Sequence, residues 1–497
     1  MTDPSAASAP PAPVALGDAF PGLFAGAGAE AAFSVLTADS RQVVPGAVFV
    51  AVQGAKADGR AFVADAAARG ALAVVGAGPR PAGLPAGVAW GETADPRRAL
   101  ALAAARLYPR QPEHVVAVTG TAGKSSVADF SRQLFAACGR RAASLGTIGV
   151  IGPQGVRYGS LTTPDPLTLH RILDGLARDG VTHLAMEASS HGLDQRRLDG
   201  VRLAAAAFTN LGRDHLDYHP DEESYFAAKA RLFAEVAPTT AVAVVNADTS
   251  HGQEMLLIAS ARGMRTLTIG RSGDDIQLLE CEPDGFAQKL EVTVEGATYR
   301  IRLPLCGAFQ ADNALMAAGL CLAAGEEPDV VMPALERLKG VPGRMERVGE
   351  VNGALVVIDY AHKPDALREV LKALRPFASG RLWCLFGAGG DRDAGKRPLM
   401  GDVASRCADR VIVTDDNPRS EDPAAIRAAI LAAAPQAKEI GDRGEAIRYA
   451  VGRLEPGDVL VIAGKGHETG QIVGDRTLPF SDHEAARAAI LDAGGAA

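Results

Sequence analysis

The segment AVTGTAGKSSVADF, Ala117 to Phe130, contains the residue types of a phosphate-binding loop. Its end, Gly123-Lys124-Ser125, fits the motif G-x-x-x-x-G-K-[ST], but Val118 stands where the first glycine belongs. A lysine and a hydroxyl at the start of a helix are suited to the phosphates and the Mg²⁺ ion of a nucleotide. The segment therefore predicts an ATP or GTP site with a shortened loop. The alternative is a glycine turn with an exposed lysine.

This loop is expected to join a strand to a helix. The run HVVAV reads as a strand, and Val127, Phe130 and Leu134 recur at the spacing of one apolar helix face. Free N–H groups and the helix dipole at such a turn favour phosphate, and its glycines let the backbone approach the ligand. The candidate nucleotide contacts are Thr119, Gly120, Thr121, Ala122, Gly123, Lys124, Ser125 and Ser126.

Three further side chains with chemical potential follow the loop. Glu187 ends the apolar run VTHLAME and enters a polar turn, where a carboxylate is suited to bind Mg²⁺. His215 lies between two aspartates and is either a metal ligand or an ordinary polar loop residue. Lys229, in FAAKARLF, is either functional or a lysine that extends from a half-buried helix face to solvent.

The elements that must position these residues follow an alternating pattern. The β-branched runs HVVAV, VTHLAME, RLAAAAFTN and TAVAVVN alternate with helical segments, which predicts a parallel sheet covered on both faces. Before them, GAVFVAVQG, GRAFVADAAARG and ALAVVGAG predict a strand, a helix and a strand in a smaller α/β domain that ends near Pro109.

Beyond a break in the helical pattern near residue 340, four apolar runs each lead into a polar loop. They are GALVVIDYAHKPDALREVLKAL, RLWCLFGAGGDRD, DRVIVTDDNPRSEDPAAIRAAIL and GDVLVIAGKGHETG. Ligands of open α/β sheets bind outside the carboxyl ends of the strands, so these loops predict one ligand-binding face. We therefore predict an α/β protein with a disordered, Ala/Pro-rich tail at residues 1–15 and three domains at 16–109, 110–340 and 341–497.

Composition limits the class of protein. A chain of 497 residues is too long for one core, and 47% hydrophobic with 22% charged residues is typical of soluble globular proteins. A net charge of -8 without a dense basic run argues against a nucleic-acid partner. No apolar run reaches the ~20 residues that cross a bilayer, so membrane insertion is not expected.

The start of the chain and its cysteines point to the compartment. MTDPSAASAPPAPVALG lacks the basic and apolar regions of a secretory signal. The 6 cysteines are scattered without a C-x-x-C pair, as expected for reduced thiols. We expect a cytoplasmic enzyme.

Several motifs in order, T-G-T-x-G-K-[ST], the glutamate of MEASSHGL, DHLDYH and AK..LF, resemble the Mur ligases, ATP-dependent amide-forming enzymes of peptidoglycan synthesis. The resemblance extends from Asp39 to Glu468, and the family's shorter loop accounts for Val118. It implies a small N-terminal uridine-nucleotide domain, a central P-loop ATPase domain with a parallel sheet, and a C-terminal Rossmann-like domain that binds the incoming amino acid.

The resemblance also implies a mechanism. The γ-phosphoryl group of ATP is transferred to a substrate carboxylate, and an amine attacks the resulting acyl phosphate. Lys124 would bind the phosphates, Ser125 and Glu187 would hold one Mg²⁺, and His215 with a carbamylated Lys229 would help to hold a second. Further ATP contacts are implied at Asn313, Arg344, Asp359 and His362.

The remaining motifs imply the substrates. TADSRQVVPG, QGAKADGR and LTTPDPL match the UDP-MurNAc-dipeptide site of the family member that adds the third amino acid, with contacts at Ser40, Ala55, Lys56, Ala57, Thr162, Thr163, Ser189, Gln195 and Arg197. DDNPRSED is the form used for meso-diaminopimelate, with contacts at Arg392, Asp416, Asn417, Pro418, Arg419, Gly464 and Glu468. The implied reaction joins meso-diaminopimelate to the D-glutamate of UDP-MurNAc-L-Ala-D-Glu.

Three alternatives stay open. A lysine-adding version of the enzyme would leave Arg419 without the distal carboxylate that a guanidinium can grip with two hydrogen bonds. A folylpolyglutamate synthetase-like ligase would need neither a uridine-nucleotide domain nor the D-N-P-R sequence. A non-enzymatic P-loop protein would not need Glu187, His215 and Lys229 together.

Two departures from the family pattern concern the nucleotide site. Ala122 and Gln310 both stand where asparagine is usual, which leaves the nucleotide affinity open. The expected oligomeric state is a monomer.

Overall fold

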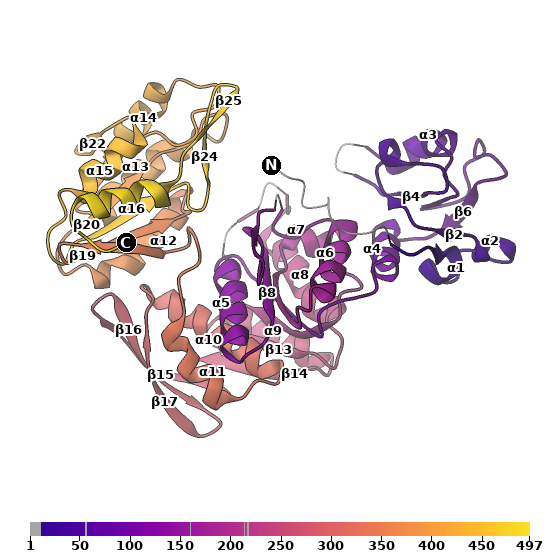
Figure 1. Ribbon diagram of the computed structural model, residues 1–497, viewed down its shortest axis with the longest axis horizontal. Coiled ribbons are helices and arrows are strands. Elements are labelled where there is room, and N and C mark those ends of the chain that lie inside the picture. The colour runs from indigo at the N-terminus through magenta and orange to yellow at the C-terminus, as the bar shows by residue number, and fades with distance from the viewer. Residues whose placement is uncertain (1–10, 55–56, 160, 213, 216–217) are drawn as a thin grey trace. The chain divides into compact units, whose positions relative to one another are not determined.

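The computed structural model describes residues 11–54, 57–159, 161–212, 214–215 and 218–497. The chain forms two compact units, one of residues 1–274 with 316–331 and one of residues 275–315 with 332–497, and each is described by itself. Successive stretches of the chain build α/β structure on separate sheets (Figure 1), as the sequence predicts.

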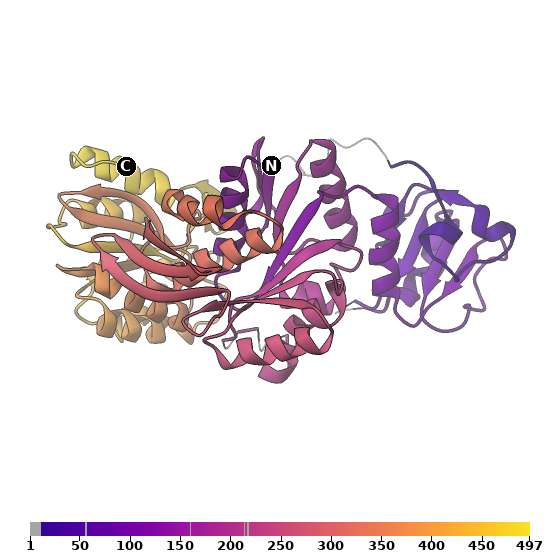
Figure 2. The same cartoon turned by 90° about the horizontal axis from the view of Figure 1, so that it is seen from below.

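The N-terminal part of the first unit contains a four-stranded parallel sheet in the order β3-β4-β5-β6, with α4 against it (Figure 2). The predicted strand–helix–strand pattern is confirmed. Its elements are β1 (Val14–Ala15), α1 (Leu16–Ala19), α2 (Ala27–Glu30), β2 (Ala32–Phe33), β3 (Leu36–Thr37), β4 (Val48–Ala51), α3 (Val63–Ala68), β5 (Ala73–Gly76), β6 (Ala89–Glu92) and α4 (Pro96–Leu107), with 3₁₀ turns η1 (Ser40–Gln42) and η2 (Gly59–Phe62).

The start of the fold differs from the predicted tail. Val14 and Ala15 form β1 and pair with Phe33 and Ala32 of β2, and the next residue, Leu16, is fully buried. Burial of this apolar side chain and pairing of the backbone before it offset the entropy of ordering the segment. The prediction that the disordered tail extends to residue 15 is therefore wrong for Val14 and Ala15, and residues 1–10 lie outside the described part.

The central part contains six parallel strands in the order β8-β11-β7-β12-β13-β14, with antiparallel β9 and β10 beyond β8. The predicted parallel sheet is thus confirmed. Its elements are β7 (His114–Thr119), α5 (Lys124–Ala137), β8 (Ala142–Gly146), β9 (Gly149–Gly152), β10 (Gly155–Arg157), α6 (Pro166–Arg178), β11 (His183–Glu187), α7 (Ser190–Asp194), β12 (Leu203–Phe208), α8 (Glu222–Arg231), the π-helical turn η3 (Leu232–Val236), β13 (Val242–Asn246), α9 (Ser250–Ala261) and β14 (Arg265–Gly270).

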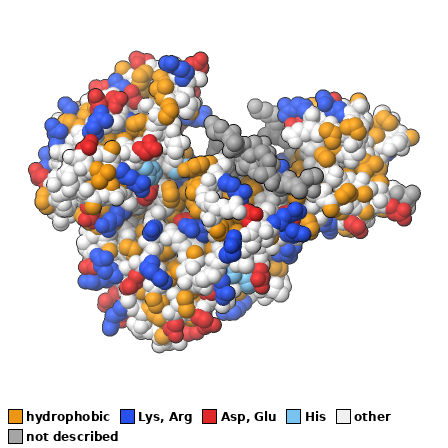
Figure 3. All heavy atoms as spheres, viewed as in Figure 1, with side chains coloured by type: hydrophobic (Ala, Val, Ile, Leu, Met, Phe, Trp, Pro, Cys, Tyr) orange, Lys and Arg blue, Asp and Glu red, His pale blue; other side chains and the backbone are white. Residues whose placement is uncertain are grey.

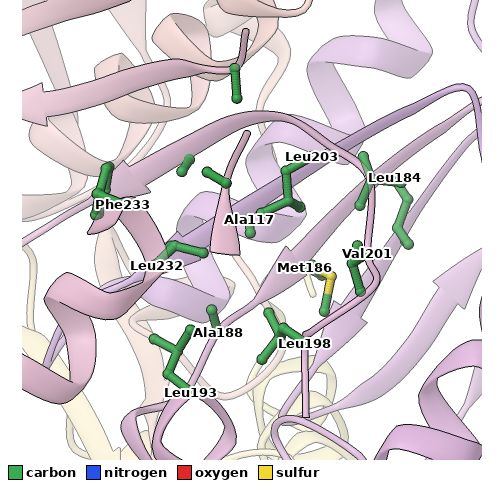
Figure 4. Packing of buried hydrophobic residues seen from close by; sticks show 14 of the residues in the cluster. Ala117, Leu184, Met186, Ala188, Leu193, Leu198, Val201, Leu203, Leu232 and Phe233 are labelled. Carbon is green, nitrogen blue, oxygen red and sulfur yellow. The ribbon is translucent and has the colours of Figure 1, made fainter. Parts of the chain in front are cut away.

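A buried apolar cluster packs along one face of this sheet. Figure 4 shows Ala117 of β7, Met186 of β11 and Leu203 of β12 packed with Leu193 of α7 and Phe233 of η3. All five are at most 4% exposed. Close packing of this kind fixes the strand ends, and with them the loops that carry the candidate residues.

The second unit contains an antiparallel meander and a six-stranded sheet in the order β18-β19-β23-β20-β21-β22, parallel except for β18. Its elements are β15 (Ile276–Asp284), β16 (Ala287–Val294), β17 (Ala297–Leu303), η4 (Leu335–Arg337), β18 (Glu346–Val351), β19 (Ala354–Asp359), α12 (Pro364–Leu374), η5 (Arg375–Phe377), β20 (Leu382–Phe386), α13 (Lys396–Cys407), β21 (Arg410–Val413), α14 (Pro423–Leu431), β22 (Lys438–Glu439), α15 (Arg443–Val451), β23 (Val459–Ala463), β24 (Gly470–Val473), β25 (Arg476–Pro479) and α16 (Asp482–Asp492), while α10 (Ala308–Ala323) and α11 (Pro328–Ala334) have residues in both units.

Alternation along the strands of the six-stranded sheet explains why its runs are apolar throughout. In β19, Leu355 and Val357 pack with helices α12, α13 and α14, whereas Val356 and Ile358 pack with α15 and α16. A strand buried on both faces needs an apolar side chain at every position, which is the pattern that the sequence shows.

The outer features agree with the composition. On the face shown in Figure 3, basic and acidic side chains are interspersed. All 6 cysteines are free thiols. Among the described residues, no helix combines the length and the apolar character needed to span a bilayer.

Candidate functional site

The phosphate-binding loop has the predicted position between β7 and α5. A Cβ at Gly120 would overlap the hydroxyl of Thr209, and Gly123 has a φ of 86°, so both positions require glycine. The ammonium of Lys124 donates to the carbonyl oxygens of Gly120 at 2.8 Å and Thr121 at 2.9 Å. The loop thus holds its lysine across the turn where a phosphate would lie.

Ala122 is held by its backbone. Its N–H donates to the side-chain oxygen of Asn210 at 3.0 Å, and its carbonyl accepts from the Thr209 hydroxyl at 2.7 Å. Residues just beyond β12 therefore support the turn without a side chain at position 122.

Glu187 lies at the end of β11, beside the start of α5. The Ser125 hydroxyl donates to Glu187 Oε1 at 2.9 Å, while Thr147 donates from its N–H to Oε1 at 2.8 Å and from its hydroxyl to Oε2 at 3.2 Å. A Cβ at Gly146 would overlap this carboxylate. Three adjacent strands, β8, β11 and β7, therefore bring a hydroxyl and a carboxylate together.

These oxygen donors fit Mg²⁺, which is commonly bound by one or two carboxylates and substrate phosphates rather than by a complete protein cage. Within the described residues, no group of three or more His, Cys, Asp or Glu side chains is arranged to hold a metal ion. One hydroxyl and one carboxylate suit an ion that takes its other oxygen ligands from a nucleotide and water.

Lys229 is buried, with 1% of its surface exposed. Its ammonium donates to the Gly120 carbonyl at 2.7 Å and lies 4.1 Å from the ring centre of Tyr225, whose hydroxyl is 3.2 Å from the Thr121 hydroxyl. Burial, together with the positive charge of Lys124, lowers the pKa of Lys229 from 10.5 to about 6. The environment of this side chain therefore favours the neutral amine over the ammonium.

His215 belongs to a group of aromatic rings near the same loop. Its backbone has a φ of 54°, and its Nε2 lies 3.6 Å from the Asp214 carboxylate. The ring centre is 4.9 Å from that of His191 and 6.1 Å from that of Tyr225. The structure therefore brings His215 to the neighbourhood of Lys229 through Tyr225.

The residues predicted to contact the dipeptide lie around Glu187. Thr163 donates to the Glu187 carbonyl at 3.0 Å and accepts from the Ser189 hydroxyl at 3.0 Å, while Arg197 donates to the Thr163 carbonyl at 2.6 Å. Arg197 also donates to the side chain of Gln195 at 2.8 Å, and the hydroxyls of Thr162 and Thr147 are 3.0 Å apart. All five predicted residues therefore belong to one network, which comprises Thr162, Thr163, Ser189, Gln195 and Arg197.

The N-terminal candidates lie on the four-stranded domain. Ser40 is buried in the turn η1, and a hydrogen bond from it lowers the pKa of the Asp65 carboxyl. The carbonyl of Ala57 accepts from the Gly54 N–H at 2.9 Å. Ala55 and Lys56 lie outside the described residues.

In the second unit, the nucleotide candidates surround the end of β19. Asp359 accepts from the N–H groups of Met345 at 2.8 Å and Ala361 at 2.7 Å, and burial raises its pKa. The Arg344 guanidinium lies 4.8 Å from the ring centre of Tyr360, and its buried Nε has no hydrogen-bond partner within the described chain.

Two more nucleotide candidates of this unit make local contacts. His362 is bonded through Nδ1 to the Tyr360 carbonyl at 3.0 Å, and burial lowers its pKa. Asn313 donates to the Gln310 side chain at 3.1 Å, and Gln310 in turn donates to the Arg344 carbonyl at 3.4 Å. The glutamine that replaces the usual asparagine therefore links two of the candidates.

Three side chains form a hydrogen-bonded group, here called the Glu468 cluster: Asn417, Lys465 and Glu468. Asn417 donates to Glu468 Oε2 at 2.9 Å, and the fully buried Lys465 donates to the same oxygen at 3.2 Å and to Asn417 Oδ1 at 3.0 Å. The loops that follow β21 and β23 thus meet through these contacts, and Glu468 is oriented by two donors on one carboxylate oxygen.

Arg419 lies beside this cluster on the same loop as Asn417. Its guanidinium donates to the Gly390 carbonyl at 2.8 Å. Glycine is required next to the loop, because a Cβ at Gly390 would overlap the Pro418 carbonyl and a Cβ at Gly464 would lie 2.6 Å from the Asp416 carboxylate. Arg392, by contrast, is exposed and donates to the Asp391 carbonyl at 3.4 Å.

Sequence reasoning missed three residues of these networks. Tyr225 precedes Lys229 by one helical turn, and Lys465 lies inside the quoted GKGHE motif, so spacing could have identified both. Thr147 follows a short strand without any motif of its own. Only the pairing of β8 with β11 places it against Glu187.

Comparisons with known protein families find matches along most of the chain. Family models match three successive segments: the "Mur ligase family, catalytic domain" at residues 32–108, the "Mur ligase middle domain" at 118–321, and the "Mur ligase, glutamate ligase domain" at 343–466. The first two segments carry the candidates of the first unit, and the third carries those at the ends of β19, β20, β21 and β23 except Glu468, which lies two residues beyond it.

Individual relatives are similar over most of the chain. A Bradyrhizobium diazoefficiens protein named UDP-N-acetylmuramoyl-L-alanyl-D-glutamate--2,6-diaminopimelate ligase is 58% identical over 91% of this chain and 93% of its own. A solved structure with the same enzyme name is 33% identical, with a TM-score of 0.74 over 97% of this chain and 99% of its own. Mycobacterium tuberculosis folylpolyglutamate synthase, solved with ADP, shares the fold at 20% identity, with a TM-score of 0.60 over 74% of this chain and 91% of its own.

Proposed function

The chain belongs to the Mur ligase family of ATP-dependent ligases, and we propose that it joins meso-diaminopimelate to the D-glutamate of UDP-MurNAc-L-Ala-D-Glu. The product is the UDP-MurNAc-tripeptide of peptidoglycan synthesis. The names of the relatives at 58% identity support this choice of substrates, and the residues around Arg419 support it independently.

The reaction has two steps. A carboxylate oxygen of D-glutamate bonds to the γ-phosphorus of ATP while the bond to ADP breaks, which gives an acyl phosphate. The amine of diaminopimelate then bonds to the carbonyl carbon, loses a proton, and expels phosphate with the electron pair of the broken C–O bond. Negative charge accumulates on the phosphoryl group and the carbonyl oxygen, so nearby cations lower both barriers.

The residues of the phosphate-binding loop would carry the first step. Lys124 would exchange its bonds to loop carbonyls for the transferred phosphoryl group, and the N–H groups at the start of α5 would bind phosphate oxygens. Ser125 and Glu187 would hold Mg²⁺, which when bound neutralises phosphate charge. The bonds from Thr147 would keep the Glu187 carboxylate aimed at that position.

Lys229 would serve as a carbamate. Its neutral amine can add to CO₂ with loss of one proton, and this converts a would-be cation into a carboxylate-like oxygen donor. Together with His215 it would help to hold a second Mg²⁺. The buried position of Lys229 against Gly120 and Tyr225 supports this assignment, since a permanent cation there would be costly.

The observation that carries the choice of amino acid is that the Arg419 guanidinium lies 3.5 Å from the carbonyl oxygen of Asn417, a member of the Glu468 cluster. Asn417, two residues before Arg419, donates to Glu468, so a guanidinium and a carboxylate belong to one group of loops. Arg419 would bind the distal carboxylate of diaminopimelate with two hydrogen bonds, and Glu468 would bind the distal ammonium. Lysine has the ammonium but lacks the carboxylate. Arg392, Asp416, Pro418 and Gly464 would complete the site.

The remaining assignments belong to the same proposal. Ser40, Ala55, Lys56 and Ala57 would contact the uridine nucleotide, and Thr162, Thr163, Ser189, Gln195 and Arg197 the rest of that substrate. Asn313, Arg344, Asp359 and His362 would contact ATP. The domains would extend over residues 16–109, with Val14 and Ala15 added to the first, 110–340 and 341–497, and the enzyme would act as a cytoplasmic monomer.

Phosphate release tests this proposal. ATP and UDP-MurNAc-L-Ala-D-Glu are supplied with meso-diaminopimelate, with L-lysine, or without an amino acid, in parallel reactions. Sustained release only with diaminopimelate is the expected result. Release with lysine would keep the ligase and reject the role of Arg419, whereas no release with any acceptor would reject the proposed reaction.

A further inference from the structure

The loop Asp416–Arg419 contains a backbone conformation that its own sequence does not favour. Arg419 has a φ of 53°, in the left-handed region that a non-glycine residue seldom adopts. Such a residue persists only where surrounding contacts fix it. The contacts that do so come from the antiparallel hairpin β24–β25, residues Gly470–Val473 and Arg476–Pro479.

The free edge of β24 and the next residue, Gly474, form hydrogen bonds with both the N–H and the carbonyl of Arg419. The Arg419 N–H donates to the Ile472 carbonyl at 3.0 Å, and the Arg419 carbonyl accepts from the Gly474 N–H at 2.7 Å. Arg419 also forms a parallel bridge with Val473. The hairpin therefore fixes the direction in which the guanidinium leaves the backbone.

The same edge reaches the two residues at the start of the loop. The Ile472 N–H donates to Asn417 Oδ1 at 3.0 Å, which leaves the Asn417 amide nitrogen directed at Glu468. The side chain of Gln471 donates to the Asp416 carbonyl at 2.8 Å. One strand edge thus contacts Asp416, Asn417 and Arg419.

Packing into a core does not account for the hairpin. All four residues of β25 are exposed, as is Val473, and Gln471 and Ile472 on the loop side are only half-buried. A hairpin of two strands is marginal in water on its own, so this one and the loop that it binds stabilise each other.

We propose that the hairpin β24–β25 determines specificity for the incoming amino acid by holding Arg419 in place, with Gln471 as a positioning residue. This inference rests on the proposed function, because it assumes that Arg419 binds the distal carboxylate. Gln471 itself acts through the Asp416 carbonyl and not on the substrate.

The test compares Gln471→Met and Gln471→Asn with the matched control Arg476→Ala. Methionine has a similar length but no donor, and asparagine is too short by one methylene to reach the carbonyl. Arg476 is on the exposed strand of the same hairpin. The two Gln471 variants should raise the KM for diaminopimelate about three- to tenfold, as for a lost hydrogen bond, and leave kcat and the KM for ATP unchanged. The control should match the unmodified enzyme.

Amide hydrogen exchange gives a second readout that does not need activity. The peptide containing Arg419 should exchange several times faster in both Gln471 variants than in the control. Unchanged exchange in both variants would overturn the inference. If the unmodified enzyme does not use diaminopimelate, the proposed function fails, while the exchange comparison still decides whether Gln471 holds the loop.

Discussion

The phosphate-binding loop and the loop Asp416–Arg419 are stabilised in different ways. Lys124 is held by the carbonyls of Gly120 and Thr121, which lie four and three residues away in the sequence. Arg419 is held by Gly390, Ile472 and Gly474, which lie 29 to 55 residues away. The groups that hold Lys124 lie in one continuous motif, whereas those that hold Arg419 come from separate loops.

This difference separates the chemistry from the choice of substrate. The phosphate contacts of the first step need a cation and free N–H groups at a helix start, which a short segment can supply, whereas the proposed Mg²⁺ ligands Glu187, His215 and Lys229 come from other segments. Recognition of one amino acid needs a guanidinium and a carboxylate at a set spacing, which loops from several strands must define. Changes in the first loop should therefore affect every acceptor equally, and changes in the second should affect only the amino acid.

The largest effect is expected for Lys124→Ala. Loss of this cation over the transferred phosphoryl group should reduce phosphate release about 10³-fold or more, with diaminopimelate and lysine alike. Lys289→Ala, at an exposed position of β16, is the control and should behave as the unmodified enzyme. Near-normal turnover of the Lys124 variant would show that the loop does not act on ATP.

A smaller effect, about a hundredfold on turnover, is expected for Lys229→Arg, because arginine cannot form the carbamate. With a pKa lowered to about 6, the Lys229 amine should be mostly protonated at pH 5 and mostly neutral at pH 7. At constant CO₂ pressure, carbamate should therefore increase as the pH rises from 5 to 7.

Labelling with ¹³CO₂ and carbon NMR measures this directly. A carbamate signal should be present at pH 7, weak at pH 5, and missing in Lys229→Arg. A signal of equal strength in that variant would place the modification on another amine, and no signal at pH 8 would contradict the carbamate.

Arg419→Ala tests the loop Asp416–Arg419. Loss of a charged pair of hydrogen bonds should raise the KM for diaminopimelate about ten- to a hundredfold and leave the KM for ATP unchanged. Arg406→Ala, 77% exposed on α13, is the control. If the variant still prefers diaminopimelate over lysine, Arg419 does not bind the distal carboxylate.

The sequence predicted the elements with a strong local pattern. The strands around Val116, Ala185, Val244 and Val461 are confirmed because short, nearly continuous apolar runs are typical of buried parallel strands. The antiparallel meander Ile276–Leu303 was not predicted, although Glu295-Gly296 marks a turn in it. Its strands alternate between exposed and buried residues, so no continuous apolar run identifies them.

The candidate site divides in the same way. The loop around Lys124 and the carboxylate of Glu187 could be placed at neighbouring strand ends from motif and periodicity. Thr147 and Gln471 could not, because each reaches its partner through a tertiary contact between segments that are distant in the sequence. The sequence identified Lys229 as a candidate, but its low pKa follows from burial, which is known only from the fold.

A competition experiment tests the central claim most directly. The enzyme is given ATP, UDP-MurNAc-L-Ala-D-Glu, and equal amounts of meso-diaminopimelate and L-lysine in one reaction, and the nucleotide product is identified by mass spectrometry. The account predicts that the diaminopimelate-containing tripeptide is the main product by a large excess. Equal amounts of the two tripeptides, or a main product that contains lysine, would contradict it.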